Sequence, residues 1–309
     1  MNLIASRCRR KAVYSSQEQR NAAVFRERII DEVCYALGVG RSGVMRQLLG
    51  PLFRRPAARF GRISARADEE VDRSGLSGGA RRILPDLNMT VRSRGAEFVP
   101  ADGALLVVSN HPGALDSIAI LSSIPRMDIS VLLSDVSFTR AFSAARRHFI
   151  YVPPGTAGRG ATLRASIDHL KNGGALMIFA HGDVEPDPEV SPGAPEAIQD
   201  WSRSIEIMLR KVPECRLQVA IASGVLMRRF LRSPIVRIRK TPARRQKLAE
   251  VLQLCRQAIS PRSVRTDVHI SFAKPVSGVD LAGQALMPAV IKIARELLED
   301  HLTALDSSP

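Results

Sequence analysis

The sequence has few aromatic residues and few cysteines. Phe, Tyr and Trp make up 5% of its 309 residues, and no segment interleaves aromatic with basic residues as a base-stacking surface for nucleic acid does. The cysteines lack the paired spacing of a zinc site or a disulfide framework. We therefore expect no metal site, no nucleic-acid partner and a reducing environment. The four cysteines are Cys8, Cys34, Cys215 and Cys255.

Long apolar runs are also missing. No window reaches the roughly 18 uncharged apolar residues of a membrane-spanning helix, and Arg7, Arg9 and Arg10 precede no signal-peptide core. The formal net charge of +15 favours an anionic partner. These features predict a cytoplasmic protein that associates peripherally with the inner face of the cell membrane.

Residues 1–84 are expected to form a basic helical region. A first helix ends near Gly38, and a second amphipathic stretch from Val44 combines apolar residues with arginines and is interrupted by Pro51 and Pro56. A basic helix with a compact apolar face can lie on an anionic bilayer surface. The alternative is a helix that packs on the main domain and keeps its basic edge in water.

Short apolar segments alternate with helical patterns over residues 85–280. This alternation predicts an α/β fold in which a mixed, mostly parallel sheet is flanked by helices. The expected strands cover residues 105–109, 129–133, 149–152, 175–179, 217–222, 235–238 and 268–272. The expected helices cover residues 114–124, 161–171 and 195–209.

Two further helices are expected toward the C-terminus. One lies between the last two strands, where basic residues outnumber Glu250, and residues 281–309 contain a C-terminal helix packed on the core. The buried side of the first is expected to carry Leu248, Val251, Leu252, Cys255 and Ile259.

Asn110, His111 and Asp116 lie between the expected strand 105–109 and the helix that follows. Open α/β sheets display functional side chains at such turns. An imidazole, with an ordinary pKa of about 6.5, can take a proton from an alcohol at neutral pH. A carboxylate early in the helix can orient that imidazole and stabilise its charged form. Taken singly, each residue can equally be a capping or hydrogen-bonding group.

The Asn-His-x4-Asp pattern of Asn110, His111 and Asp116 resembles the first motif of the glycerolphosphate and lysophospholipid acyltransferase superfamily. The resemblance covers roughly residues 84–222. In that family the histidine is the general base for an acceptor hydroxyl, which attacks the thioester of acyl-CoA or acyl carrier protein. The resemblance implies the same roles for His111 and Asp116. It implies no permanently bound cofactor, because the acyl thioester is a substrate.

The second and third motifs of that family are degenerate here. The second ends at Val152, where the family has an arginine. In the third, Phe179 and Gly182 match, His181 takes the position of a glutamate, and Val184 replaces an arginine that in the family helps hold the acceptor phosphate. Neither valine can make the bidentate contacts that guanidinium groups make with phosphate.

Other residues are candidates to replace these contacts. Arg159, in a glycine-bearing loop, is one, as are Arg146 and Arg147, although each fits an ordinary surface arginine. Three nearby carboxylates favour an acceptor with hydroxyl or amine groups, or are solvated loop residues beside prolines. These carboxylates are Asp183, Glu185 and Asp187.

We therefore predict an acyltransferase that moves a fatty acyl chain from acyl-CoA or acyl carrier protein to a hydroxyl of a lysophospholipid or related lipid. The expected partners are the lipid acceptor, the acyl donor and an anionic membrane surface. The alternatives are an enzyme for a non-phosphate acceptor, such as an aminolipid, glycolipid or sterol-like alcohol, and a non-catalytic membrane-binding relative. The candidate site comprises catalytic His111 and Asp116 with substrate-binding Asn110, Arg159, His181 and Gly182.

Overall fold

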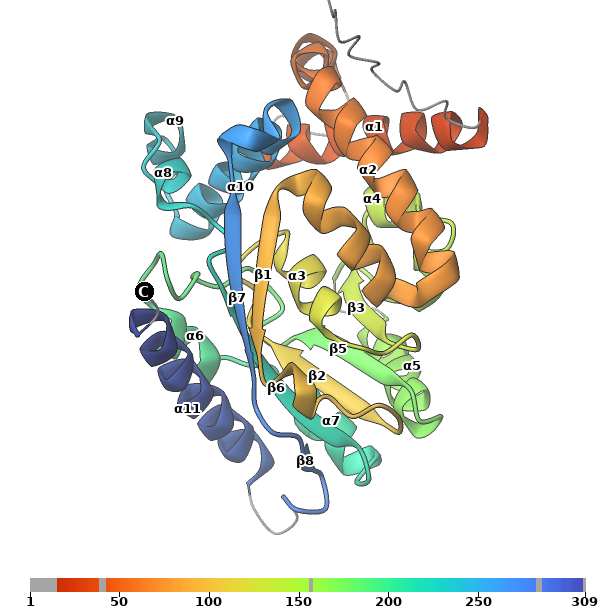
Figure 1. The fold of residues 1–309 in the computed structure, drawn as a ribbon, viewed down its shortest axis with the longest axis vertical. Helices are drawn as coiled ribbons and strands as arrows, with labels where there is room; N and C mark the ends of the chain where they lie inside the picture. The colour runs from red at the N-terminus through yellow and green to blue at the C-terminus, as the bar shows by residue number, and fades with distance from the viewer. Residues whose placement is uncertain (1–15, 39–42, 156–157, 282–284, 308–309) are drawn as a thin grey trace, which may run out of the picture.

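A computed structural model describes most of the chain, and the described residues form a three-layer α/β structure around one mixed sheet (Figure 1). The strand order is β1-β7-β6-β2-β5-β3-β4, and β8 pairs with β6. All pairs are parallel except those that β6 makes with β7 and β8. The predicted α/β class is therefore confirmed. The described residues are 16–38, 43–155, 158–281 and 285–307, so Arg7, Cys8, Arg9 and Arg10 lie outside them.

The strands and helices have the following bounds. The strands are β1 (Met89–Arg94), β2 (Leu105–Ser109), β3 (Ser130–Ser134), β4 (Phe149–Val152), β5 (Ala175–Phe179), β6 (Arg216–Ser223), β7 (Thr266–Phe272) and β8 (Val276–Ser277). The α-helices are α1 (Ser16–Ala36), α2 (Val44–Ile83), α3 (Asp116–Ser123), α4 (Ser137–Arg140), α5 (Arg159–Lys171), α6 (Ala194–Gln199), α7 (Ser204–Lys211), α8 (Arg228–Leu231), α9 (Pro234–Arg237), α10 (Pro242–Ile259) and α11 (Leu286–Asp306). Short 3-10 helices cover Leu84–Leu87, Ala96–Phe98, Ala145–His148 and Pro261–Ser263.

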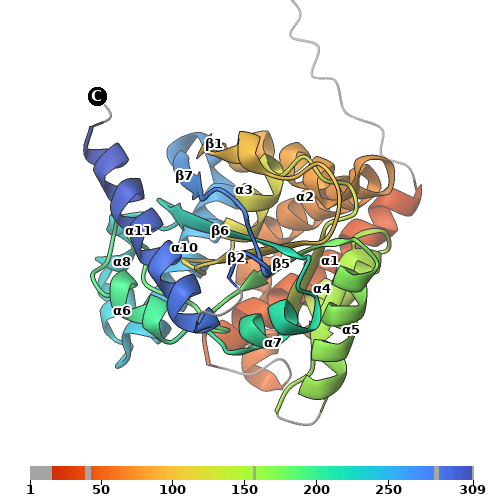
Figure 2. The ribbon, with the colours of Figure 1, turned by 90° about the horizontal axis from the view of Figure 1, so that it is seen from below.

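Strand β2 shows why the sequences of the central strands are continuous apolar runs. Its Leu105 and Val107 pack into one core with α2 and α3, whereas Leu106 and Val108 pack into a second core with α5, α7 and α11. Figure 2 shows the sheet between these two layers. Because a parallel sheet is covered on both faces, successive side chains are apolar rather than alternating.

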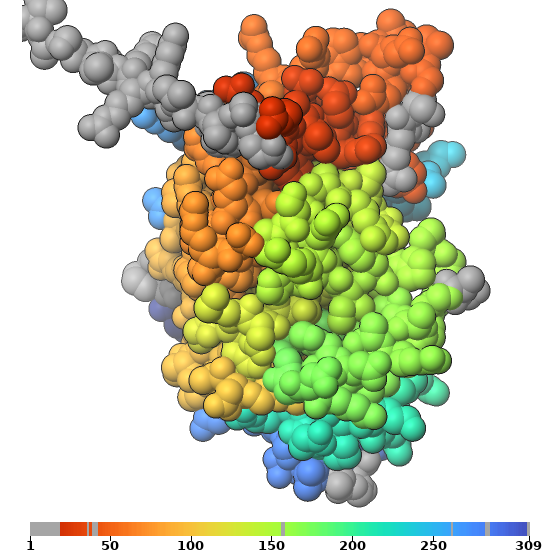
Figure 3. All heavy atoms as spheres, turned by 90° about the vertical axis from the view of Figure 1, so that its right-hand side faces the viewer, coloured from red at the N-terminus to blue at the C-terminus, as the bar shows by residue number. Residues whose placement is uncertain are grey.

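Helices α1 and α2 lie side by side and extend beyond the sheet (Figure 1). Their surface forms one end of the molecule, in red and orange in Figure 3. Helix α2 runs through Pro51 and Pro56, so the expected interruption is wrong. This part of α2 packs against α1, where Phe53 and Ala57 contact the cluster of Ile30 and Cys34. The kink lies instead at Ser74 and Gly75, where Gly75 has a φ of 67° and a Cβ would come within 2.7 Å of the Met127 carbonyl oxygen. No described helix has the length and apolar character needed to cross a membrane.

Three sequence predictions differ from the structure. The expected strand 235–238 is the short helix α9, which begins at Pro234, a residue suited to a first helical turn. The expected helix 195–209 is two helices, α6 and α7, and Trp201 lies buried between them. Strand β1 was not expected, because this edge strand buries only its first residue.

The buried side of α10 also differs from the expectation. Leu248 is buried as predicted, but Ile259 is 62% exposed. Gln246, Gln253 and Gln257 are buried instead, and each donates hydrogen bonds to backbone or side-chain oxygens of neighbouring segments. Hydrophobic periodicity misses this arrangement because it treats glutamine as a surface residue.

Candidate active site

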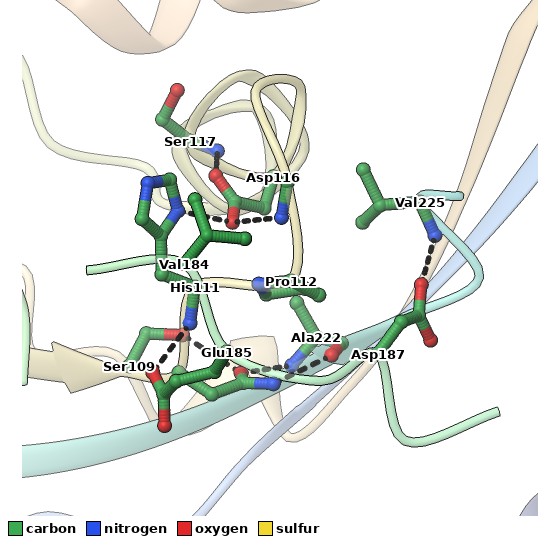
Figure 4. A network of polar contacts seen from close by, with 12 residues as sticks. Ser109, His111, Pro112, Asp116, Ser117, Val184, Glu185, Asp187, Ala222 and Val225 are labelled. Carbon is green, nitrogen blue, oxygen red and sulfur yellow. Dashed lines mark hydrogen bonds and ion pairs between the residues drawn. The ribbon is translucent and has the colours of Figure 1, made fainter. Parts of the chain in front are cut away.

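The predicted pair, His111 and Asp116, is in direct contact. The His111 Nδ1 lies 2.7 Å from the Asp116 Oδ2 (Figure 4). A carboxylate only accepts hydrogen bonds, so the proton of this contact belongs to Nδ1 and the lone pair belongs to Nε2. The imidazole is about a quarter exposed, at 24% of its side-chain surface, and Nε2 is therefore the nitrogen available to a reactant.

Asp116 is held by the turn that carries His111. It is fully buried, at 0% exposure, and begins α3. Its Oδ2 accepts a hydrogen bond from the Gly113 N–H at 3.1 Å, and its Oδ1 accepts one from the Ser117 N–H at 2.5 Å. These donors fix the carboxylate, and the carboxylate in turn fixes the imidazole ring.

Glu185, from the loop after β5, supports the other side of His111. Its Oε2 accepts the His111 N–H at 2.8 Å, and its own N–H donates to the His111 carbonyl at 2.8 Å. The Glu185 Oε1 accepts the indole N–H of Trp201 at 3.0 Å. From α10, the Gln246 side chain donates to the carbonyls of both Pro112 and Glu185. Two segments distant in sequence thus hold the backbone of the histidine.

The Asn110 side chain is engaged by the sheet. Its Oδ1 accepts the Ala222 N–H at 2.8 Å, and its Nδ2 donates to the Ala222 carbonyl at 2.9 Å. Asn110 is 3% exposed. The amide thus joins the end of β2 to β6, and the predicted substrate contact gains no support from these bonds.

The His111 ring stacks on Phe179, the last residue of β5, with ring centroids 4.1 Å apart. Strand β5 is the neighbour of β2 in the sheet, so the two strand ends place these rings together. Stacking restricts the tilt of the imidazole, while Asp116 sets its rotation. The ring of His111 is therefore positioned before any substrate arrives.

Acidic side chains dominate the electrostatics of the site. Burial acts to lower the pKa of His111, but Asp116, Glu250 and Glu185 raise it, and the net pKa lies above the ordinary value. Burial raises the pKa of Glu185, against hydrogen bonds from Trp201 and the His111 N–H. Burial also raises the pKa of Glu250 to about 8. Acids around the imidazole favour its charged form, which a general base reaches during reaction.

Asp187 organises the loop after β6. It is 1% exposed and accepts hydrogen bonds from the N–H groups of Gly224, Val225 and Leu226, at 3.1, 2.9 and 3.2 Å. Burial raises its pKa to about 6. Asp183, in contrast, is exposed and pairs with Lys247 at 3.3 Å. A solvated reading therefore fits Asp183 but not Asp187 or Glu185.

His181 and Gly182 follow β5 directly and so lie at the same edge of the sheet as His111. The His181 Nδ1 is buried and has no hydrogen-bond partner among the described residues. Gly182 is exposed and has a φ of 82°, the left-handed conformation that favours glycine. Their substrate contacts remain predictions.

Arg159 lies farther from His111. It begins α5 after β4, and β4 is three strand positions from β2, which corresponds to about 14 Å across the sheet. Its Nε donates to the Gly155 carbonyl at 3.1 Å. A groove of about 410 Å³ opens beside this turn, between β4 and α5, with Arg140 and Tyr151 among its lining residues. The structure therefore does not bring Arg159 together with the His111 pair.

Sequence reasoning undervalued several residues that build the site. For Glu185 and Asp187 the sequence left open an acceptor contact or a solvated position, and the roles of Trp201, Gln246 and Glu250 were not expected. The sequence carries one signal for α10, because Gln246, Glu250, Gln253 and Gln257 recur at helical spacing. Among the residues described, no three His, Cys, Asp or Glu side chains are grouped to hold a metal ion.

The likeness of this chain to known proteins is limited. No family model and no curated protein matches it. Among solved structures, it is similar to the crystal structure of the 1-acyl-sn-glycerophosphate (LPA) acyltransferase PlsC from Thermotoga maritima, with a TM-score of 0.47 and 17% sequence identity over 94% of this chain and 100% of that chain.

Proposed function

We propose that this protein is an acyltransferase that moves a fatty acyl chain from acyl-CoA or acyl carrier protein to a hydroxyl of a lipid acceptor. The observation that carries the proposal is the 2.7 Å contact between His111 Nδ1 and the buried Asp116, which leaves Nε2 free. The Asn-His-x4-Asp resemblance supplies the reaction class. The absence of a nucleophilic serine in that pattern fits a reaction in which the acceptor provides the hydroxyl.

His111 is proposed to transfer one proton in each direction. Its Nε2 takes the hydroxyl proton as the acceptor oxygen attacks the thioester carbonyl. The tetrahedral intermediate then collapses, the carbon–sulfur bond breaks, and the thiolate leaves with the proton from Nε2. Asp116 stabilises the imidazolium between these steps without taking a proton itself.

The test is an acyl-transfer screen with a labelled acyl-CoA and a labelled acyl carrier protein. The acceptors are lysophospholipid, aminolipid, glycolipid and sterol, and the control is His111→Gln. We expect transfer to one acceptor class with the wild type and none with the variant. Transfer that is equal in both proteins, or absent across the whole panel, contradicts the proposal.

A lysophospholipid is the first acceptor to test, and an acceptor without phosphate is the second candidate. The specific observation for the second is that Val184 precedes Glu185, whose N–H binds the His111 carbonyl, so an apolar side chain lies where the family has a phosphate-binding arginine. The carboxylates of Asp116 and Glu185 also disfavour an anion beside the imidazole. Activity on lysophosphatidic acid together with inactivity on neutral and amine-bearing acceptors contradicts this candidate.

We also propose that the N-terminal helices bind an anionic membrane surface from the cytoplasmic side. Val44, Leu48 and Leu52 share one side of α2 and are 70%, 65% and 71% exposed. Arg54 and Arg55 follow on the same helix and are exposed. Apolar side chains beside arginines fit the boundary between headgroups and acyl chains.

We propose that helix α9, near the end of α1, adds to this surface. Ile235 and Ile238 are 55% and 77% exposed, and Arg239, just after α9, donates a hydrogen bond to the Leu37 carbonyl at the end of α1. In vesicle sedimentation with anionic lipid, we expect Leu48→Ser/Leu52→Ser to lose most binding. The matched control is Ile207→Ser on α7, in the layer on the other face of the sheet. Equal binding of all three proteins contradicts the membrane surface.

A further inference from the structure

Glu250 is the single acidic residue among residues 228–262, a stretch rich in arginine and lysine. It lies on α10 in register with Gln246, Gln253 and Gln257, because spacings of four and three residues return to one side of a helix. The three glutamines on this side are buried and donate hydrogen bonds to oxygens of neighbouring segments. The side of α10 that carries Glu250 therefore otherwise presents buried amide side chains, whereas Glu250 places a carboxyl group there.

The Glu250 carboxyl group lies against the turn that carries His111. Its Oε1 is buried and accepts no hydrogen bond within the part of the chain described. A Cβ built on Gly113 would lie 3.2 Å from this oxygen, so Gly113 leaves the room that the carboxyl group occupies. Gly113 is also the residue whose N–H holds Asp116. One short turn therefore separates Glu250 from the His111 and Asp116 pair.

The charged groups that act on Glu250 come from several segments. His111, after β2, and Lys247, on α10 itself, stabilise its ionised form, whereas Asp116 on α3 destabilises it. Glu185, after β5, acts on the same imidazole. An acid that is buried among other acids holds its proton to a higher pH than an exposed one.

We propose that Glu250 titrates in this site in addition to His111. Its carboxyl group carries a proton at neutral pH and, on losing it, makes His111 a stronger base. The proton leaves the carboxyl group to solvent, and the resulting carboxylate stabilises the imidazolium form of His111 through space. Glu250 acts through His111 and is a positioning residue. Its effect on catalysis rests on the acyl transfer proposed above, whereas its effect on His111 protonation does not.

The direction of the effect follows from the coupling of the two groups. Burial, opposed by His111, places the pKa of Glu250 at about 8, and the carboxylates around His111 raise the pKa of the imidazole. When two coupled groups titrate, each reports the protonation of the other. His111 should therefore show a second step when Glu250 loses its proton near pH 8.

The test is a histidine-labelled NMR titration from pH 5 to pH 10, with the His111 signal assigned by its loss in His111→Gln. We expect two steps at His111 in the wild type and one in Glu250→Gln, whose highest apparent pKa at His111 falls by about one unit. The matched control, Asp183→Asn, makes the same chemical change at an exposed carboxylate and should keep both steps. An upper step that persists in Glu250→Gln, or a single step in the wild type, overturns the proposal.

Folding and activity measurements separate the remaining explanations. Glu250→Gln should unfold at no lower temperature than the wild type at pH 8, because the raised pKa of Glu250 means that its ionisation destabilises the folded state. A structural role alone predicts a lower unfolding temperature and an unchanged His111 titration. If NMR shows the coupling but no acceptor is acylated, the proposed function fails and the coupling stands. If transfer occurs and its pH profile is identical in Glu250→Gln, the catalytic effect of Glu250 fails and acyl transfer stands.

Discussion

Two histidines of this protein lie near the sheet with opposite surroundings. His111, in the turn after β2, has one nitrogen on a carboxylate and the other open to a reactant. His301, on α11, is 2% exposed and has both nitrogens engaged, with Nε2 2.8 Å from the Ser223 hydroxyl and Nδ1 2.8 Å from the Ser271 hydroxyl. A contact between histidine and serine resembles a catalytic pair, but only His111 keeps a nitrogen that a substrate can reach.

His111 and His301 also differ in the direction in which the pKa is shifted from its ordinary value. Burial and the nearby His269 lower the pKa of His301 to about 4, so this imidazole stays neutral at physiological pH. At His111, burial acts in the same direction, but surrounding carboxylates outweigh it. The pKa of His301 is therefore lowered in its buried site, whereas the carboxylates around His111 raise the pKa of that imidazole.

The largest effect is expected from His111→Gln. The variant should lose transfer activity by about 10³- to 10⁴-fold, because it removes the proton acceptor. His301→Gln should leave the transfer rate near that of the wild type, since His301 contacts no reactant. The measurement is the steady-state transfer rate of each purified variant. A comparable loss of activity in both variants contradicts the distinction between His111 and His301.

Asp116→Asn tests the orientation of the ring. An amide at this position can donate its N–H to Nδ1, which moves the imidazole proton to Nε2 and blocks proton acceptance. We expect a loss of about 10²- to 10³-fold in kcat with an unchanged KM. An unaltered kcat shows that the buried carboxylate does not orient His111, and a changed KM assigns it to substrate binding.

The pH dependence of stability should distinguish His301. The unfolded chain binds this proton near the ordinary pKa of 6.5 and the folded chain only near pH 4. The stability from this group is therefore complete above pH 6.5 and is lost as the pH falls toward 4, by about 3 kcal/mol. Urea unfolding at pH 7 and pH 4.5 should show a smaller decrease for His301→Gln than for the wild type. Equal decreases contradict a buried neutral His301.

Smaller effects are expected from two neighbouring residues of α10, and the larger of the two comes from Gln246→Leu. This change leaves the buried carbonyls of Pro112 and Glu185 without their donor and should destabilise the fold by about 2 kcal/mol, with a modest loss of activity. Its neighbour Lys247 forms an exposed pair with Asp183, so Lys247→Ala should change stability by less than about 1 kcal/mol. Chemical unfolding measures both variants, and similar values for the two show that Gln246 does not hold the His111 turn.

Local patterns predicted much of the sheet. Strands β2, β4 and β5 have the expected bounds, and β3 begins and ends one residue later than expected. The predictions failed where burial depends on distant partners. Strand β1 carries polar residues and exists because it pairs with β7, and the face of α10 is buried through glutamines that bind other segments.

In the candidate site, too, local patterns were predicted correctly and contacts with distant segments were not. The five-residue spacing of His111 and Asp116 identified the pair, since it places a carboxylate in the first turn of the helix after the histidine. For Glu185 the sequence left open a contact with the acceptor or a solvated position beside prolines, yet the side chain is 2% exposed and binds the His111 N–H. No local signal distinguishes a carboxylate in water from one that holds the backbone of a residue 74 positions away.

The sequence by itself determined the α/β class and the pair His111 and Asp116, because strand burial and a short spacing are local properties. Only the tertiary structure decided which acids surround the imidazole and which histidine stays open. Glu185 and Gln246 meet the His111 turn from 74 and 134 residues away. Contacts over such separations depend on strand order and helix packing, which place β5 beside β2 and α10 against the turn.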